Sequence, residues 1–159
     1  MENNTETGLI ELVKRGGVYY RTPGASPREV ITNLIDRVAA SGADREKLLE
    51  AVLEREALMS TAVGHGIALP HPRNPLIKGE AEQFVAIAFL EQRVDWKALD
   101  GEPVRTVMLI VSASSKLHLH TLSRINYFCQ QERFRQLLDR CPPQDDIITA
   151  IAEAEQTWK

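Results

Sequence analysis

The chain has 159 residues, of which 43% are hydrophobic and 26% are charged, and its formal net charge is −3. This length and apolar content are those of one domain with a full core, and they exclude a disordered chain. The charge balance offers no basic footprint for nucleic acid, and no apolar run approaches the roughly 18 residues that predict a membrane-spanning helix. Residues 1–7 are polar and acidic, unlike a secretory signal peptide.

The first half of the chain predicts a leader and then alternating elements. Residues 1–8 are expected to be a disordered leader, and residues 9–156 a single domain. The elements expected next are a short helix or turn at residues 9–16, a strand at 18–21, a helix from Ser26-Pro27 to Gly42, a helix from Asp44 to about Leu58, and a loop over 59–66. Ser26 followed by Pro27 is typical of an N-cap and a first helical residue.

The second half predicts the remaining strands and three helices. The expected elements are strands at residues 67–69, 84–90 and 104–111, a turn at 74–79, and helices at 116–130, at 133–138 and from Asp145 or Asp146 to 155. The runs at 84–90 and 104–111 are almost continuously apolar, as in strands that are buried on both faces. Helices that alternate with buried strands predict an α/β fold, with a mixed sheet flanked by helices in a three-layer α/β/α sandwich.

A histidine framed by arginines is the strongest chemical signal in the chain. His71 follows Pro70, and Arg55 and Arg73 lie on either side of it in sequence. Histidine is the side chain best suited to act as a neutral nucleophile at pH 7. Arginine is the residue best suited to hold phosphate oxygens. The pattern therefore predicts a phosphoryl group carried on nitrogen.

Small residues before His71 are candidates for binding that phosphoryl group. Gly64 and Gly66 allow the backbone to approach an anion and to present N–H groups to it, although a tight turn is the other interpretation. Ser60 and Thr61 are hydroxyl donors, with loop capping as the alternative. His65, between the glycines, is either a further donor or an exposed loop residue.

A second histidine pair lies on the predicted helix 116–130. At about 100° per residue, Leu119, Leu122, Ile125, Asn126 and Cys129 cluster around one direction of this helix. His118 lies about 40° from the centre of that stripe and His120 about 160° from it. We therefore expect His118 to point inward and His120 to face solvent.

Together these residues resemble the enzyme IIA domains of the fructose–mannitol class of the bacterial sugar phosphotransferase system, and most closely their nitrogen-regulatory branch. The matching pattern is Arg55-Glu56, Ser60-Thr61, Gly64-x-Gly66-Ile67-Ala68-x-Pro70-His71, a connecting segment at residues 94–104, and His118-Leu119-His120-Thr121-Leu122-Ser123. It covers roughly residues 9–156. Two departures are His65, where that branch often has asparagine, and Pro72-Arg73 after the histidine. These departures leave the partner surface and the shape of the phosphate pocket open.

The resemblance implies a fold, a chemistry and partners. It implies the same α/β sandwich, with His71 as the acceptor of a phosphoryl group from a histidine-containing phosphocarrier protein. It places His118 beside His71 as a hydrogen-bonding and charge-stabilising group and gives Arg55 the role of stabilising the phosphoryl group, with Arg73 as a secondary candidate. No cofactor, ATP or metal ion is implied, and the expected location is cytoplasmic. The acceptor is a regulatory target or a separate IIB component.

Other functions stay open at this point. A sugar-transport IIA and a regulatory module that passes nothing on share the first step. A metal site made of His65, His71, His118 and His120 is disfavoured because residues two apart on a helix point in different directions, and HExxH is absent. A domain with a dead site is disfavoured because Arg55, His71 and His118 are all present.

Overall fold

A computed structural model describes residues 8–38, 45–77 and 79–156. The helices are α1 (Leu9–Gly16), α2 (Pro27–Val38), α3 (Arg45–Leu58), α4 (Ser115–Cys129), α5 (Glu132–Asp139) and α6 (Gln144–Glu155), with a short 3₁₀ helix η2 (Glu80–Glu82). The strands are β1 (Val18–Thr22), β2 (Ala62–Gly64), β3 (Ile67–Ala68), β4 (Phe84–Val94) and β5 (Val104–Val111).

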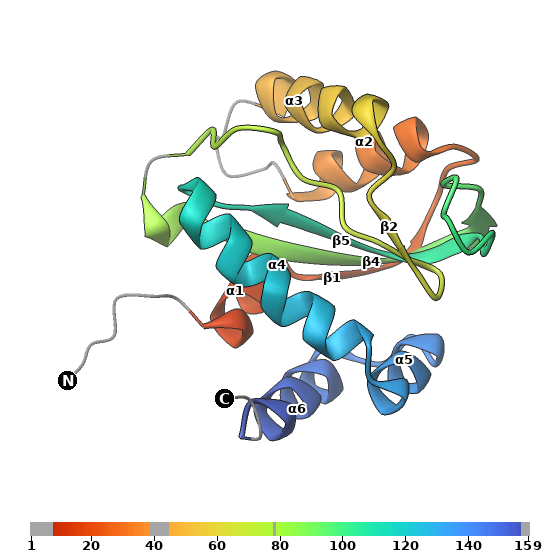
Figure 1. The fold of residues 1–159 in the computed structure, drawn as a ribbon, viewed down its shortest axis with the longest axis vertical. Coiled ribbons are helices and arrows are strands. Elements are labelled where there is room, and N and C mark those ends of the chain that lie inside the picture. The colour runs from red at the N-terminus through yellow and green to blue at the C-terminus, as the bar shows by residue number, and fades with distance from the viewer. Residues whose placement is uncertain (1–7, 39–44, 78, 157–159) are drawn as a thin grey trace.

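The strands form one mixed sheet in the order β1-β4-β5-β3-β2. β1 runs parallel to β4, and β3 runs parallel to β5, whereas the β4–β5 and β2–β3 pairs are antiparallel. Figure 1 shows α2 and α3 over one face of the sheet, and α1, α4, α5 and α6 over the other. The predicted three-layer α/β/α sandwich is therefore confirmed.

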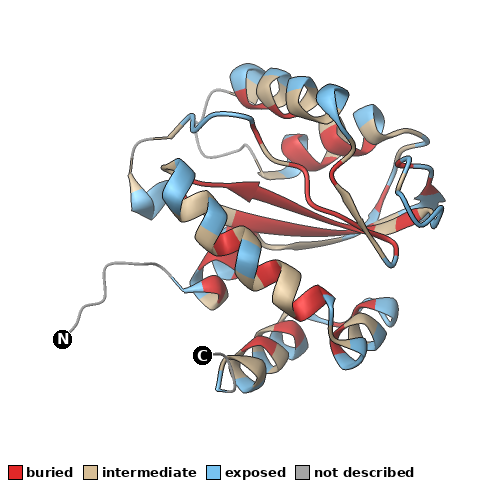
Figure 2. Cartoon of the chain, in the orientation of Figure 1, coloured by how far each residue is buried: buried red, intermediate tan, exposed pale blue. Residues whose placement is uncertain are grey.

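Alternating side chains of the central strands serve two separate cores. On β4, Val85, Ile87 and Phe89 pack in the cluster that includes residues of α1, α4, α5 and α6. Ala86 and Ala88 point the other way, into the cluster with α2 and α3. Because both faces are covered by helices, the central strands are buried throughout most of their length, as Figure 2 shows.

Several element boundaries differ from the sequence prediction. The expected loop at residues 59–66 contains β2, which pairs with β3, and β4 continues to Val94 instead of residue 90. Ser114 is the N-cap of α4 and accepts a hydrogen bond from the Leu117 N–H at 3.1 Å, so this helix begins at Ser115. The predicted Asp145 or Asp146 cap of α6 is wrong: Pro143 holds the N-cap position, and both aspartates lie in the first turn.

The N-terminal expectations are only partly covered. Gly8, assigned to the leader, is the N-cap of α1, whereas residues 1–7, Gly42 and Asp44 lie outside the described residues. The predicted Ser26 cap is confirmed, because its hydroxyl accepts a hydrogen bond from the Glu29 N–H at 3.2 Å. Within the described ranges, no helix combines the length and the apolar character needed to cross a bilayer.

Candidate functional site at the end of strand β3

His71 is placed by a short extended segment that continues β3. The Leu69 N–H donates to the Thr61 carbonyl at 3.0 Å, and the Ile110 N–H of β5 donates to the Pro70 carbonyl at 3.0 Å. Leu69 and Pro70 are buried, and His71 is half-buried at the point where the chain leaves the sheet. The segment before the ring is therefore held from both sides.

One nitrogen of the His71 ring is engaged by the backbone. Nδ1 lies 2.8 Å from the Leu69 carbonyl oxygen. A carbonyl oxygen only accepts hydrogen bonds, so the bond requires the proton on Nδ1. In the neutral ring this leaves the lone pair on Nε2, the nitrogen that can act as a nucleophile.

His118 comes from the first turn of α4 and lies against His71. The two ring centroids are 4.4 Å apart, and the ring planes are inclined by 41°. The backbone N–H of His118 donates to the Ser114 carbonyl at 2.9 Å, within the capped N-terminal turn. Two histidines 47 residues apart in sequence therefore share one site, as the inward orientation of His118 predicted.

The buried stripe of α4 differs from the predicted one. Thr121, Ile125, Phe128 and Cys129 are the buried residues of the helix, whereas Leu119 is 62% exposed. Their mean direction lies about 75° from the predicted centre, but His118 is still within about 40° of it. The expected solvent exposure of His120 is wrong: this side chain is half-buried, with its Nε2 3.3 Å from Nη1 of Arg124.

Both rings are held in the neutral form. Burial is the main cause that lowers the pKa of His71, and the nearby Arg55 charge lowers it further, against the opposing effects of the Leu69 hydrogen bond and Glu56. Burial, followed by the charges of His71 and Arg55, lowers the pKa of His118 to about 4. A positive charge on one ring would also repel a positive charge on the other, so contact between the two imidazoles acts in the same direction as burial and favours the neutral forms.

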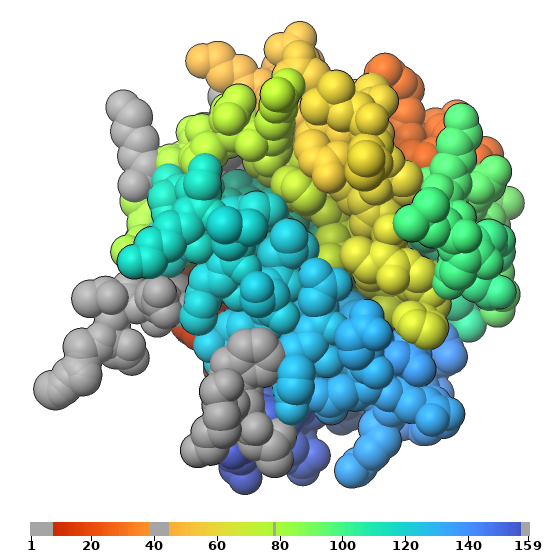
Figure 3. All heavy atoms as spheres, in the orientation of Figure 1, coloured from red at the N-terminus to blue at the C-terminus, as the bar shows by residue number. Residues whose placement is uncertain are grey.

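Arg55 completes a group of three. It lies in the last turn of α3, and its Nη1 donates to the Met59 carbonyl at 2.7 Å. Its positive charge lowers the pKa of both histidines, so Arg55 acts on the pair electrostatically. In Figure 3 the atoms of α4 and of the segments at residues 58–66 and 70–77 adjoin on one face of the molecule.

The hydroxyl groups of Ser60 and Thr61 are engaged elsewhere. Thr61 Oγ1 donates to Glu56 Oε1 at 2.6 Å, and Ser60 Oγ donates to the Trp96 carbonyl at 2.5 Å while accepting from the Ala62 N–H at 3.1 Å. This is the loop-capping alternative. The structure does not bring either hydroxyl into contact with the histidine pair. Sequence reasoning omitted Glu56 as a site residue, although it directly follows Arg55 in the motif.

Gly64 and Gly66 lie at the opposite end of β3 from His71. The Gly66 carbonyl accepts from the N–H groups of Arg105 and Thr106 at the start of β5, whereas Pro70 pairs with Ile110 near its end. The φ angles of Gly64, His65 and Gly66 are 92°, 57° and 77°, which is the left-handed conformation of a tight turn. The turn interpretation therefore applies, and the predicted role of these glycines in holding phosphate does not fit their position.

Arg73 lies on the site side of the molecule. It lines a hollow of about 250 Å³ together with Pro72, Ser114, His118 and Leu119. The four histidines do not converge: the His65 N–H donates to Asp100 Oδ2 at 2.9 Å in the β2–β3 turn, away from His71. In the part of the chain that the structure describes, no group of three or more His, Cys, Asp or Glu side chains could hold a metal ion.

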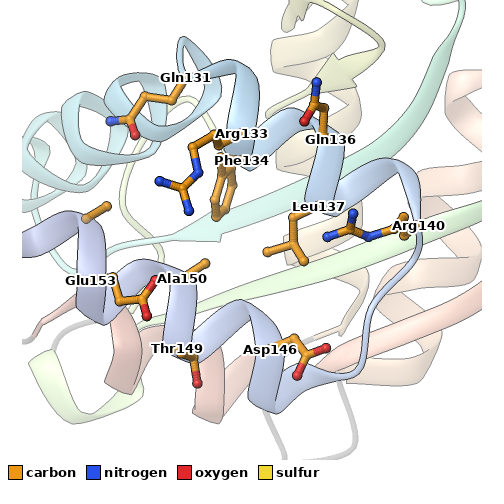
Figure 4. A pocket seen from close by; sticks show the side chains of 11 residues that line it. Gln131, Arg133, Phe134, Gln136, Leu137, Arg140, Asp146, Thr149, Ala150 and Glu153 are labelled. Atoms are coloured by element: carbon orange, nitrogen blue, oxygen red, sulfur yellow. The ribbon is translucent and has the colours of Figure 1, made fainter.

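A separate groove lies between α5 and α6. It has a volume of about 580 Å³, and Figure 4 shows Arg133 and Arg140 on one side and Asp146 and Glu153 on the other. None of its lining residues belongs to the histidine site. Concavity alone would thus have pointed to the wrong part of the molecule.

Comparison with known proteins decides the family. A family model described as "Phosphoenolpyruvate-dependent sugar phosphotransferase system, EIIA 2" matches residues 11–154. The chain belongs to the EIIA 2 family. Members of this family are components of the phosphotransferase system, and the resemblance read from the motifs is confirmed at this level.

Two curated relatives differ in how much of their length this EIIA 2 protein covers. The fructose-specific EIIABC component of Bacillus subtilis is 28% identical over 152 residues, which is 93% of this chain but 24% of that relative. The nitrogen regulatory protein of Pseudomonas aeruginosa is 28% identical over 151 residues, or 92% of this chain and 96% of its own length.

Solved structures support the fold of this EIIA 2 protein. The nitrogen regulatory protein IIA-Ntr of Neisseria meningitidis superposes with a TM-score of 0.77 at 20% identity, over 89% of this chain and 97% of that chain. The enzyme IIAMTL chain in its complex with phosphorylated enzyme IIBMTL from Escherichia coli gives 0.71 at 17% identity, over 87% and 95% of the two chains. At these identities the likeness concerns the fold alone.

Proposed function

We propose that this EIIA 2 protein carries a phosphoryl group on Nε2 of His71, received from a histidine-containing phosphocarrier protein. The observation that supports it most is the ring geometry: Nδ1 bound to the Leu69 carbonyl at 2.8 Å, and His118 at a centroid distance of 4.4 Å. A neutral imidazole with one nitrogen held by the backbone presents the other as a nucleophile.

The transfer step is a displacement at phosphorus. The Nε2 lone pair of His71 forms the new N–P bond while the N–P bond to the donor histidine breaks, and its electron pair returns to the donor ring. Phosphoryl transfer requires mainly in-line positioning and stabilisation of charge on the equatorial oxygens. As His71 becomes cationic, the Leu69 carbonyl stabilises the Nδ1–H that points at it.

Arg55 and His118 supply the charge stabilisation in this proposal. Arg55 is the cation whose charge acts on both histidines, and its planar guanidinium suits phosphoryl oxygens. His118, neutral in the free protein, donates one hydrogen bond and gains proton affinity when a dianionic group arrives beside it. Arg73 adds a second cation at the rim of the site. The phosphate-binding role predicted for Ser60, Thr61, Gly64 and Gly66 is left out of this proposal, because the two hydroxyls are bonded to Glu56 and the Trp96 carbonyl and the two glycines lie in the β2–β3 turn.

We further infer a regulatory output from the same site. This inference is supported by the motif resemblance to the nitrogen-regulatory branch and by the relationship of this chain to the Pseudomonas nitrogen regulatory protein. A neutral site that becomes anionic on phosphorylation changes how a partner protein binds there. Transfer to a separate IIB is the second candidate, because one structural neighbour is a IIA bound to a phosphorylated IIB. With a phosphocarrier protein as donor, the proposal also assigns the chain to the cytoplasm.

Phosphorylation is tested with phosphoenolpyruvate, enzyme I and the histidine carrier, read by intact mass at neutral pH. The wild type should gain the mass of one phosphoryl group, and the gain should be lost on acid treatment. A wild type without the gain, beside a known IIA domain that is phosphorylated in the same mixture, would refute the phosphocarrier function.

The output is tested by mixing the phosphorylated protein with IIB components. A regulatory protein should keep its phosphoryl group in their presence and should bind a target with different affinity in its two states. Rapid loss of the group to a IIB cysteine or histidine would instead establish transport.

A further inference from the structure

Glu56 lies at the centre of a hydrogen-bond cluster that borders the histidine site. Its Oε1 accepts from Thr61 Oγ1 at 2.6 Å, and its Oε2 accepts from the Thr61 N–H at 2.8 Å and from Trp96 Nε1 at 3.0 Å. Thr61 is 6% exposed and Trp96 is 1% exposed, so all three donors are shielded from water. One carboxylate thus joins α3, the start of β2 and the β4–β5 connection.

The same cluster connects to His71 through consecutive backbone hydrogen bonds. The Thr61 carbonyl accepts from the Leu69 N–H at 3.0 Å, and the Leu69 carbonyl lies 2.8 Å from Nδ1 of His71. The backbone of two residues, Thr61 and Leu69, therefore connects the Glu56 carboxylate to the imidazole. Movement of Thr61 would displace the carbonyl that holds the ring.

Glu56 also acts on the ring through its charge. Its carboxylate raises the proton affinity of His71, while Arg55, its neighbour in sequence, lowers it. The carboxylate thereby favours the positive charge that develops on the ring during transfer. Its three hydrogen bonds keep it in place near the ring instead of pairing with Arg55, whose Nη1 is on the Met59 carbonyl.

We propose that Glu56 is a positioning residue that holds His71 in its Nδ1–H tautomer, through Thr61 and the Leu69 carbonyl, so that Nε2 faces the incoming phosphoryl group. Its role in the rate of transfer rests on the proposed function, whereas its effect on the tautomer does not. Glu56 touches neither the phosphoryl group nor the donor, so its removal should lower the rate of transfer and leave carrier binding unchanged.

The test compares Glu56→Gln with Trp96→Phe as a matched control. The glutamine keeps the size of the side chain but replaces one acceptor oxygen by an NH₂ group that cannot accept from Thr61 or Trp96. The phenylalanine removes the Trp96 donor together with part of a buried ring, so it lowers stability but leaves the carboxylate and its bonds to Thr61 in place. Imidazole ¹⁵N shifts report the His71 tautomer, quenched-flow gives the rate of phosphorylation, and thermal melting reports stability.

We expect Glu56→Gln to convert His71 to a mixture of tautomers and to slow phosphorylation by roughly tenfold or more, with an unchanged KM for the carrier. Trp96→Phe should keep the wild-type tautomer and rate, even if its melting temperature falls as much as that of Glu56→Gln. If Glu56→Gln does not fold, Glu56→Asp carries the test, since its side chain is one methylene shorter and its carboxylate no longer reaches Thr61.

Three results would overturn the proposal. These are a wild-type tautomer and rate in the folded Glu56 variant, a rate that follows the melting temperature in both variants, or a changed KM alone. Failure of the wild type to accept a phosphoryl group refutes the proposed function instead, and the tautomer measurement, made without any carrier, still decides the role of Glu56.

Discussion

The two ends of strand β3 carry the two halves of one sequence motif, but they are chemically different. At one end His71 lies half-buried against His118, and both rings have a lowered pKa. At the other end His65 is exposed in a tight turn, and its backbone N–H, not its ring, is bound by Asp100. The paired histidine and the turn histidine are six positions apart in the sequence.

The comparison shows that contacts from distant segments give two histidines of one motif different environments. His71 receives a second ring from α4 and a cation from α3, and burial keeps it neutral. At the turn end the nearby charges are compensated: Arg105 pairs with Asp139, with Nη1 3.5 Å from Oδ1. Arg55 and Arg73 flank both histidines in the sequence, and glycines lie nearby, so sequence neighbours alone do not distinguish the environment of His71 from that of His65.

The largest effect should come from removing the nucleophile at the His71 end. His71→Gln keeps a donor for the Leu69 carbonyl but has no nucleophilic nitrogen, so the phosphoryl mass gain should vanish. His65→Gln, at the other end, should be phosphorylated like wild type. Intact mass after incubation with the carriers measures both. A mass gain in His71→Gln would move the acceptor to another residue.

His118→Asn should slow transfer without blocking it. Asparagine retains a hydrogen-bond donor but loses the ring that stabilises charge beside His71, and loss of one such contact costs about 100-fold in rate. Quenched-flow with phosphorylated carrier gives the rate. An unchanged rate would reduce His118 to a packing residue.

Arg55→Lys should have a smaller effect of the same kind. Lysine retains the positive charge but loses the planar donor fork, so we expect a decrease of about tenfold in rate. Arg73→Lys is the matched control at the rim and should stay near the wild-type rate. If both lysine variants behave alike, Arg55 acts only as a point charge.

The paired histidines should make stability depend on pH. Burial lowers the pKa of His118 to about 4 in the folded protein, from the ordinary histidine value of 6.5. Between these values the unfolded chain binds more protons, so the free energy of unfolding falls as pH decreases from 6.5 towards 4. Urea unfolding across this range should show a shallower dependence in His118→Gln. A dependence equal to that of wild type would contradict the lowered pKa.

The smallest effect should come from the turn end. His65 has a φ of 57°, so a β-branched residue there is strained, and His65→Val should lower the free energy of unfolding by about 1 kcal/mol or more. His65→Gly accepts this φ and should stay close to wild type in the same urea titration. Both variants should be phosphorylated normally, and a loss of transfer in either would join the two ends of β3 functionally.

Local sequence patterns were sufficient to predict the layers of the fold and the pairing of His71 with His118. Continuous apolar runs at 84–90 and 104–111 predicted the buried strands of a mixed sheet, because burial on both faces removes polar positions from a strand. Helical spacing predicted that His118 lies on the inner side of α4. This prediction holds although the buried stripe is rotated and Leu119 is exposed. These patterns depend on many neighbouring residues, so the wrong assignment of one residue does not change the prediction.

Which residues of the motif come into contact depends on the packing of the folded chain. Gly66 and His71 are separated because β3 runs along β5 between them, and the register of that pairing is not encoded in the motif itself. The role of Glu56 could not be predicted because its hydrogen-bond partners are set by folding. Thr61 lies beyond a loop, and Trp96 lies 40 residues away in the β4–β5 connection. Hydrogen bonds between distant segments leave no periodic trace in a sequence, so the residues that orient His71 become visible only when the chain is folded.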